Sequence, residues 1–237
     1  MNANPPLPPL HDLVRAYEPT LDGTVRRLLD YYDQPPGGFN YNPSRRIARA
    51  AFSQAVTQAR VRAAVSNQGV PAGRKQNAEV AEHIWDAGEG RAINCYPLSH
   101  GRFAFRRDLS IRVPADFLFV ERRTPHVFWF QPRRSFALSE LGLGVIASVF
   151  RMTFLIDDLA SAGIELLDLS APNGTRLHVQ YTLETLPTLS DAEVTAVLQQ
   201  LAQAYDAICV MQRDWVAEQR ARRAKRPSPP MEPGLFG

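Results

Sequence analysis

Two apolar segments joined by a short turn constrain the fold of this chain more than any other feature. Ala115–Glu121 and His126–Gln131 are rich in aromatic and β-branched residues, and Arg122–Pro125 lies between them. Apolar runs of this length around a tight polar turn are typical of a β-hairpin. Because the two runs are mostly apolar, we expect the hairpin at the centre of a sheet that is buried on both faces.

Strand-like and helical segments flank this hairpin. Arg102–Val113 alternates apolar and polar residues, which is typical of a strand with one buried face. The apolar-rich stretch Leu138–Ala162 predicts a long helix, with Ser135 as a candidate cap and Gly163 as its stop. The other predicted elements are one or two short helices in 10–33, helices over Ser44–Ser66 and Asn77–Ala87, strands at Ile93–Leu98, Ile164–Leu169 and Arg176–Leu183, and a helix after Ser190 with Glu193 in a capping box.

These elements predict an α/β protein whose middle holds a helix, three to four strands, a long helix and a strand. N-terminal helices and a long C-terminal helix are expected around this core. A length of 237 residues is enough for one substantial core with appendages. The predicted regions are a Pro-rich arm (1–9), an N-terminal helical region (10–70), the α/β core (75–185), a C-terminal helix (189–224) and a Pro-rich tail (225–237).

Two short motifs stand at the ends of the central strands. Pro114–Ala115–Asp116 precedes the first strand of the hairpin, and Gln131–Pro132–Arg133 ends the second. With this order of elements, roughly residues 75–170 resemble the PD-(D/E)XK nuclease superfamily, whose fold is called restriction-endonuclease-like. That family has an acid near the start of its second core strand and a (D/E)-x-K triplet on the third.

The resemblance implies a role for each of these positions. Asp116 would be the metal-binding aspartate, Gln131 would be the second metal ligand, and Arg133 would stand in the position of the lysine. Glu79 or Glu82 would match the extra acid on the preceding helix. An active member would use Mg²⁺, which polarises the phosphate and lowers the pKa of a bound water. Because glutamine is neutral and arginine spreads its charge over a plane, the triplet predicts a degenerate active site.

Arginines dominate the basic residues of the chain. All but Lys75 and Lys225 of the 27 basic residues are arginines, and no acid occurs between Asp33 and Glu79. Such basic stretches are an electrostatic footprint of nucleic-acid binding, although a GC-rich genome and solvated helix faces would also produce them. The candidate nucleic-acid-binding residues are Arg45, Arg46, Arg49, Arg106, Arg107, Arg112, Arg134, Arg222 and Arg223.

Motifs for other chemistries are absent from the sequence. The five histidines are scattered without an HxH or HExxH pattern, so a zinc site is not expected. There is no Walker A motif, no GxSxG elbow and no GxGxxG after a strand. Cys95 and Cys209 are isolated, and neither a signal peptide nor a membrane-spanning run is present, so the expected location is the cytoplasm.

Three functions are consistent with these patterns. The first is a catalytically degenerate protein that associates with nucleic acid, most simply DNA, in a mobile-element or phage-related system. The second is a non-enzymatic scaffold that binds a protein partner through the Pro-rich arm or the basic tail. The third is an active, divergent, Mg²⁺-dependent DNA endonuclease, whose cleavage would require Asp116.

Overall fold

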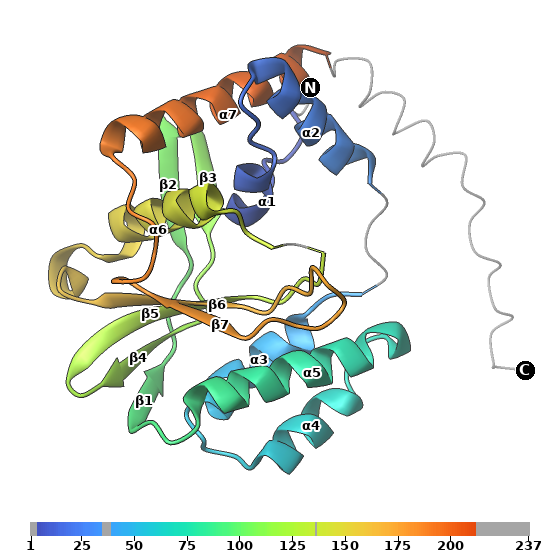
Figure 1. The fold of residues 1–237 in the computed structure, drawn as a ribbon, viewed down its shortest axis with the longest axis vertical. Coiled ribbons are helices and arrows are strands. Elements are labelled where there is room, and N and C mark those ends of the chain that lie inside the picture. The colour runs from blue at the N-terminus through green and yellow to red at the C-terminus, as the bar shows by residue number, and fades with distance from the viewer. Residues whose placement is uncertain (1–3, 35–38, 136, 212–237) are drawn as a thin grey trace, which may run out of the picture.

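The computed structural model describes residues 4–34, 39–135 and 137–211, which form an α/β fold in three layers (Figure 1). The helices are α1 (Leu10–Arg15), α2 (Leu21–Asp33), α3 (Asn42–Phe52), α4 (Gln58–Ser66), α5 (Pro71–Gly88), α6 (Glu140–Phe154), a 3₁₀ turn (Asp157–Leu159) and α7 (Asp191–Met211). The strands are β1 (Ile93–Tyr96), β2 (Gly101–Arg106), β3 (Leu109–Val113), β4 (Phe117–Glu121), β5 (Thr124–Gln131), β6 (Gly163–Asp168) and β7 (Val179–Thr182).

The middle layer is a mixed sheet of five strands in the order β1-β4-β5-β6-β7. β5 and β6 are parallel and are connected through α6, whereas the other neighbours are antiparallel. Helices α3, α4 and α5 cover one face, and α1, α2, α6 and α7 lie on the other with the separate β2–β3 hairpin (Figure 1). Among the described residues, no helix is both long enough and apolar enough to cross a membrane.

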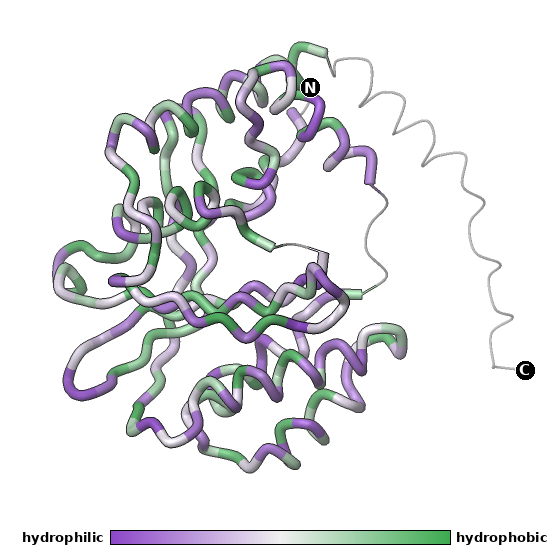
Figure 2. Tube along the Cα trace, viewed as in Figure 1, coloured by the Kyte–Doolittle hydropathy of each residue, from purple (hydrophilic) through white to green (hydrophobic). Residues whose placement is uncertain are grey.

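Two apolar cores meet at the central strands. Val127 and Trp129 of β5 are buried on the side of α1, α6 and α7, whereas Phe128 and Phe130 are buried against α3, α4 and α5. Hydrophobic residues accordingly run along the middle strands in Figure 2. The predicted hairpin at the sheet centre is therefore confirmed. Its turn is Arg122–Arg123, shorter than the expected Arg122–Pro125, and both residues have positive φ, as a type I′ turn requires.

Side-chain caps mark the starts of α6 and α7. Ser190 and Glu193 form the predicted capping box at α7, with the Glu193 carboxylate accepting from the Ser190 N–H at 2.8 Å. For α6 the prediction was wrong at both ends. The cap is Ser139 and not Ser135, since the Ser139 hydroxyl accepts the N–H of Gly142 at 3.1 Å. The helix ends at Phe154, and a separate 3₁₀ turn follows at Asp157–Leu159.

The single helix predicted over Ser44–Ser66 is wrong, because the chain forms α3 and α4 with a break between them. At the break Gln54 has a φ of 57°, a left-handed conformation that cannot continue an α-helix. Thr57 then starts α4 by accepting the N–H of Arg60. Helix α5 is longer than the predicted Asn77–Ala87, since Pro71 occupies its first turn.

The strand predicted over Arg102–Val113 is instead the β2–β3 hairpin, which turns at Arg107–Asp108 and leaves the main sheet. The alternation was read correctly, since Ile111 and Val113 are buried and Arg102 and Arg112 are exposed cross-strand neighbours. Alternation alone does not show where a strand reverses, and this explains the error.

The described part of the Pro-rich arm, residues 4–9, lies against the body of the protein. The hydroxyl of Tyr205 on α7 donates to the Pro5 carbonyl at 2.6 Å, and that of Tyr32 on α2 donates to the Pro6 carbonyl at 3.1 Å. The predicted basic end of the C-terminal helix and the Pro-rich tail lie outside the described residues.

Candidate functional site

Asp116 lies beside the end of the central strand β5. Its N–H donates to the Phe128 carbonyl at 2.9 Å, and its Oδ2 accepts the N–H of Phe130 at 3.0 Å. The side chain is only 5% exposed. Asp116 directly precedes β4 and Gln131 ends β5, so the two metal ligands implied by the sequence motifs lie at the same end of two adjacent strands.

Arg45 of α3 occupies the remaining oxygen of this carboxylate. Its Nη1 forms an ion pair with Oδ1 of Asp116, and its guanidinium lies 4.5 Å from the centroid of the Phe130 ring. Burial raises the pKa of Asp116, and the neighbouring Arg45 charge and the Phe130 N–H oppose that rise. Both carboxylate oxygens are thus engaged by donors from the protein.

Gln131 is buried and its amide turns back onto the strand end. Its Nε2 donates to the Arg133 carbonyl at 2.9 Å, and its Oε1 accepts the Arg133 N–H at 2.6 Å. The side chain therefore satisfies the backbone where β5 ends, next to Asp168 in the parallel register. This is a structural use of the residue predicted to hold a metal.

The Arg133 side chain points to α1, on the face of the sheet opposite to α3. Its Nη1 lies 2.5 Å from Oδ1 of the buried Asp12, and His11 Nε2 lies 3.4 Å from the second oxygen of that carboxylate. Burial lowers the pKa of His11 to about 3, and Arg133 and Arg45 act in the same direction. Burial raises the pKa of Asp12, and Arg133 opposes this. Sequence reasoning missed His11 and Asp12, since no motif surrounds them.

The two glutamates predicted to complete the site are engaged elsewhere. Glu79 lies 2.9 Å from Nε of Arg176, and Glu82 pairs with Arg62 of α4. Among the described residues, no hydrogen bond or ion pair joins either glutamate to Asp116. The extra acid implied by the resemblance is therefore part of the packing between α5 and its neighbours.

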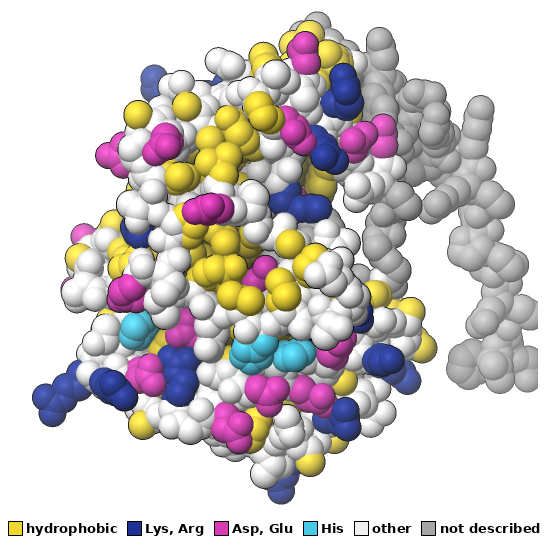
Figure 3. Space-filling model, in the orientation of Figure 1, with side chains coloured by type: hydrophobic (Ala, Val, Ile, Leu, Met, Phe, Trp, Pro, Cys, Tyr) yellow, Lys and Arg dark blue, Asp and Glu magenta, His cyan; other side chains and the backbone are white. Residues whose placement is uncertain are grey.

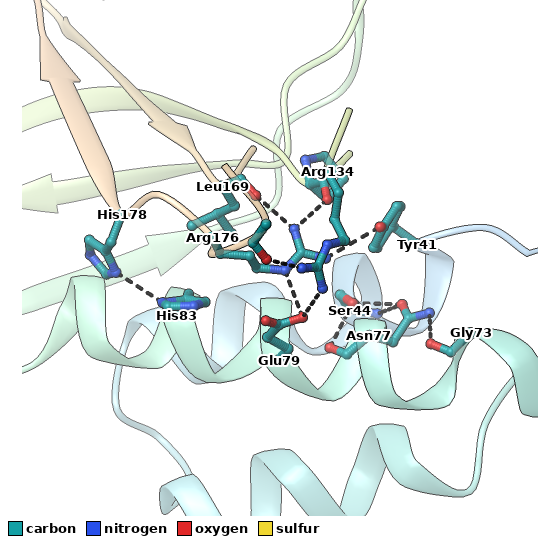
Figure 4. Close-up of polar contacts among 12 residues, drawn as sticks. Tyr41, Ser44, Gly73, Asn77, Glu79, His83, Arg134, Leu169, Arg176 and His178 are labelled. Atoms are coloured by element: carbon teal, nitrogen blue, oxygen red, sulfur yellow. Dashed lines mark hydrogen bonds and ion pairs between the residues drawn. The ribbon is translucent and has the colours of Figure 1, made fainter. Parts of the chain in front are cut away.

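Arg176 is a second residue that the sequence did not single out. Its side chain is 1% exposed and its Nη1 donates to the carbonyls of Pro132 and Leu169, at 2.7 Å each. Figure 4 shows it between Glu79 and Tyr41, so that one buried cation joins α5 to the ends of β5 and β6. An arginine after a turn carries no sequence signal for such a role.

The arginines predicted to bind nucleic acid divide into three groups. Arg45, Arg106 and Arg134 are engaged within the protein, Arg106 by Asp108 and Asp206. Arg222 and Arg223 lie outside the described residues. The exposed members that form no ion pair within the described part of the chain are Arg46, Arg49, Arg107 and Arg112.

Two of the histidines meet on the surface. His83 of α5 and His178, directly before β7, place their Nδ1 atoms 3.3 Å apart, and the Asp86 carboxylate lies close to both. These two histidines are 95 residues apart in the sequence, so on the sequence alone they count as scattered. Apart from this cluster, the described residues contain no group of three metal-ligating side chains close enough to share an ion.

An apolar groove lies away from both clusters. It has a volume of about 970 Å³ and runs between β2, α6 and α7. Its walls include the rings of Phe103 and Phe105 and the exposed Met152. Apolar side chains gather over this upper part of the molecule in Figure 3. With one acid and two arginines in its lining, it offers no convergent catalytic groups.

Comparisons with protein-family models, with curated proteins and with solved structures find no match to this chain.

Proposed function

We propose that this protein associates with nucleic acid on a restriction-endonuclease-like core whose metal site is closed, so that it holds the nucleic acid without cutting it. The order α5–β1–β4–β5–α6–β6 supports this core, with the β2–β3 hairpin inserted after the first strand. Asp116 before β4 and Gln131 at the end of β5 have the spacing that the family uses for its metal ligands.

The ion pair between Arg45 and Asp116 carries the proposal that the site does not cleave. Mg²⁺ requires oxygen ligands at about 2.0–2.1 Å in octahedral geometry. At Asp116 one oxygen accepts a backbone N–H and the other is paired with a guanidinium. Gln131 directs its amide oxygen to the Arg133 N–H. A permanent cation from the protein thus stands where the metal would bind.

The exposed arginines near this end of the sheet support phosphate binding. Arg49 follows Arg45 by one helical turn, so both lie on the same face of α3. His100 lies beside this site, since its Nδ1 accepts the N–H of Ala115 at 3.4 Å. Burial lowers the pKa of His100, and the charges of Arg112 and Arg45 act in the same direction. Guanidinium groups bind phosphate without reading the base sequence, so the binding should be salt-dependent and tolerant of sequence.

The test combines binding with cleavage. Labelled linear, supercoiled and branched DNA is incubated with the full-length protein in Mg²⁺, Mn²⁺ or EDTA, and binding is measured at several salt concentrations. We expect binding without cutting, with affinity that falls as salt rises. The double variant Arg49→Ala/Arg112→Ala should reduce the slope of log affinity against log salt by about 2.

The matched control is Arg122→Ala/Arg123→Ala, which removes the same charge from the exposed β4–β5 turn. An equal loss of binding in both double variants would show that net charge alone acts. Metal-dependent cutting that Asp116→Ala abolishes would overturn the closed site and indicate a divergent nuclease. Absence of both binding and cutting would overturn the proposal and favour the protein scaffold.

A further inference from the structure

His83, Asp86 and His178 form a second polar cluster on the α5 side of the sheet. His83 and Asp86 are three residues apart on α5, so their side chains share one helical face. His178 approaches this face from the segment that enters β7 (Figure 4). Asp86 and His178 are exposed and His83 is half-buried, so a small ion can reach the cluster from solvent.

The geometry matches the coordination of a small divalent metal. In tetrahedral zinc sites each imidazole nitrogen lies about 2.0–2.1 Å from the metal, so two such nitrogens are about 3.3 Å apart. The Nδ1 atoms of His83 and His178 are 3.3 Å apart. One ligand atom from each of the three residues lies within 4.8 Å of the others. The three side chains are therefore candidates to hold a single ion.

We propose that His83, Asp86 and His178 bind Zn²⁺, with water in the fourth position. Two imidazoles and one carboxylate suit zinc, whereas Mg²⁺ and Ca²⁺ prefer ligand sets made of oxygen. The proposal is independent of the proposed function, because no hydrogen bond or ion pair within the described part of the chain joins these residues to Asp116 or to the arginines assigned to nucleic acid.

Neighbouring contacts hold the ligands in position. The Nε2 of Gln58 on α4 donates to Asp86 Oδ1 at 3.0 Å, which orients the carboxylate as an outer partner of a metal ligand does. One turn earlier on α5, Glu79 holds Arg176, two residues before His178. The segment that carries His178 is thus already attached to α5, and the metal would reinforce this attachment.

The competing explanation is a hydrogen bond between the two imidazoles, one donating and one accepting. It requires a proton between the two Nδ1 atoms and no metal. Metal binding requires both nitrogens unprotonated and both lone pairs directed to the same point. Titration with a metal therefore separates the two explanations.

The experiment titrates Co²⁺ and Zn²⁺ into the full-length protein after treatment with EDTA. Co²⁺ in a tetrahedral site has intense visible absorption that aqueous Co²⁺ lacks. We expect this spectrum to saturate at one Co²⁺ per chain and to disappear when Zn²⁺ displaces the Co²⁺. Zn²⁺ should also raise the Tm of the protein reversibly. His83→Gln and His178→Gln should each abolish the spectrum, and Gln58→Ala should weaken Co²⁺ binding about tenfold.

His100→Gln is the matched control, because His100 is an exposed histidine outside the cluster, and it should bind as the wild type does. Circular dichroism of each variant without metal verifies that it is folded. Absence of the Co²⁺ spectrum in the wild type, or its persistence in both His83→Gln and His178→Gln, would overturn the proposal.

Discussion

Arg45 pairs with Asp116 across 71 residues of sequence, and this pair joins helix α3 to the end of the central strands. The same guanidinium lies over the ring of Phe130, whose N–H donates to the other oxygen of Asp116. The carboxylate is therefore a structural anchor between the sheet and one helical layer. Its two partners explain why a charged group is tolerated at a buried position.

Asp116→Ala should destabilise the protein by about 2–3 kcal/mol, because the Phe130 N–H loses its acceptor and Arg45 loses its counter-charge. Asp116→Asn keeps an acceptor oxygen and should cost less. Urea unfolding monitored by tryptophan fluorescence measures both. A loss below about 0.5 kcal/mol in Asp116→Ala would show that the carboxylate does not anchor α3.

Arg91 is the only cation paired, among the described residues, with both Glu121 and the buried Glu165. Arg91→Met should destabilise the protein by about 3–5 kcal/mol, because Glu165 is left buried without a counter-charge. Glu165→Gln in the same background should restore part of the loss. Arg62→Met is the control, since the Arg62 side chain is 68% exposed and its pair with Glu82 should contribute under about 1 kcal/mol. Equal losses for the two arginines would contradict the assignment.

The stability of the protein should fall on acidification partly through His11. Its pKa is about 3 in the folded protein, below the usual 6.5, because burial disfavours the imidazolium. As the pH falls, His11 therefore takes up a proton in the unfolded chain before it does so in the folded protein. Its contribution to the free energy of unfolding is complete above pH 6.5 and is lost as the pH falls towards 3. A group shifted in this way adds up to about 1.4 kcal/mol per pH unit to the slope of unfolding free energy.

His11→Phe keeps a ring beside Trp129 and removes the titrating group. Its unfolding free energy, measured in urea between pH 7 and 5, should depend less steeply on pH than that of the wild type. Identical slopes would show that His11 is protonated as easily in the folded protein as in the unfolded chain.

Gly88→Ala tests the contact between the ends of α3 and α5. A Cβ at this position would lie 1.9 Å from the Phe52 carbonyl oxygen, so the two helices must separate. We expect a loss of about 3 kcal/mol in thermal or urea unfolding. Gly90→Ala is the control, since its φ is +71° but nothing lies within 4 Å of the added atom, and it should cost about 1 kcal/mol. A smaller effect at Gly88 than at Gly90 would contradict this packing.

The local pattern predicted the centre of the fold well. The hairpin Phe117–Gln131 and the capping box of α7 depend on short-range features, namely apolar runs, a tight turn and a hydroxyl three residues before a glutamate. The break between α3 and α4 and the departure of the β2–β3 hairpin were not predicted. Both depend on the distant surface against which each segment packs. The periodicity of the sequence does not encode that surface.

The candidate site shows the same division. Asp116 and Gln131 were expected at the same end of the sheet, and the structure brings them to adjacent strands. Their partners were not foreseen. Arg45 comes from a helix predicted to carry nucleic-acid-binding arginines, and Asp12 lies 121 residues from Arg133.

The sequence by itself determined the α/β class, the central hairpin and the positions of the two short motifs, because these follow from neighbouring residues and from backbone geometry. Only the tertiary structure decided which charges meet. It paired Asp116 with Arg45, buried Arg176 beside Glu79, and brought His83 within 3.3 Å of His178. The physical reason is that ion pairing and metal coordination act over a few ångströms in space, and residues far apart in the chain reach that distance only when the layers pack.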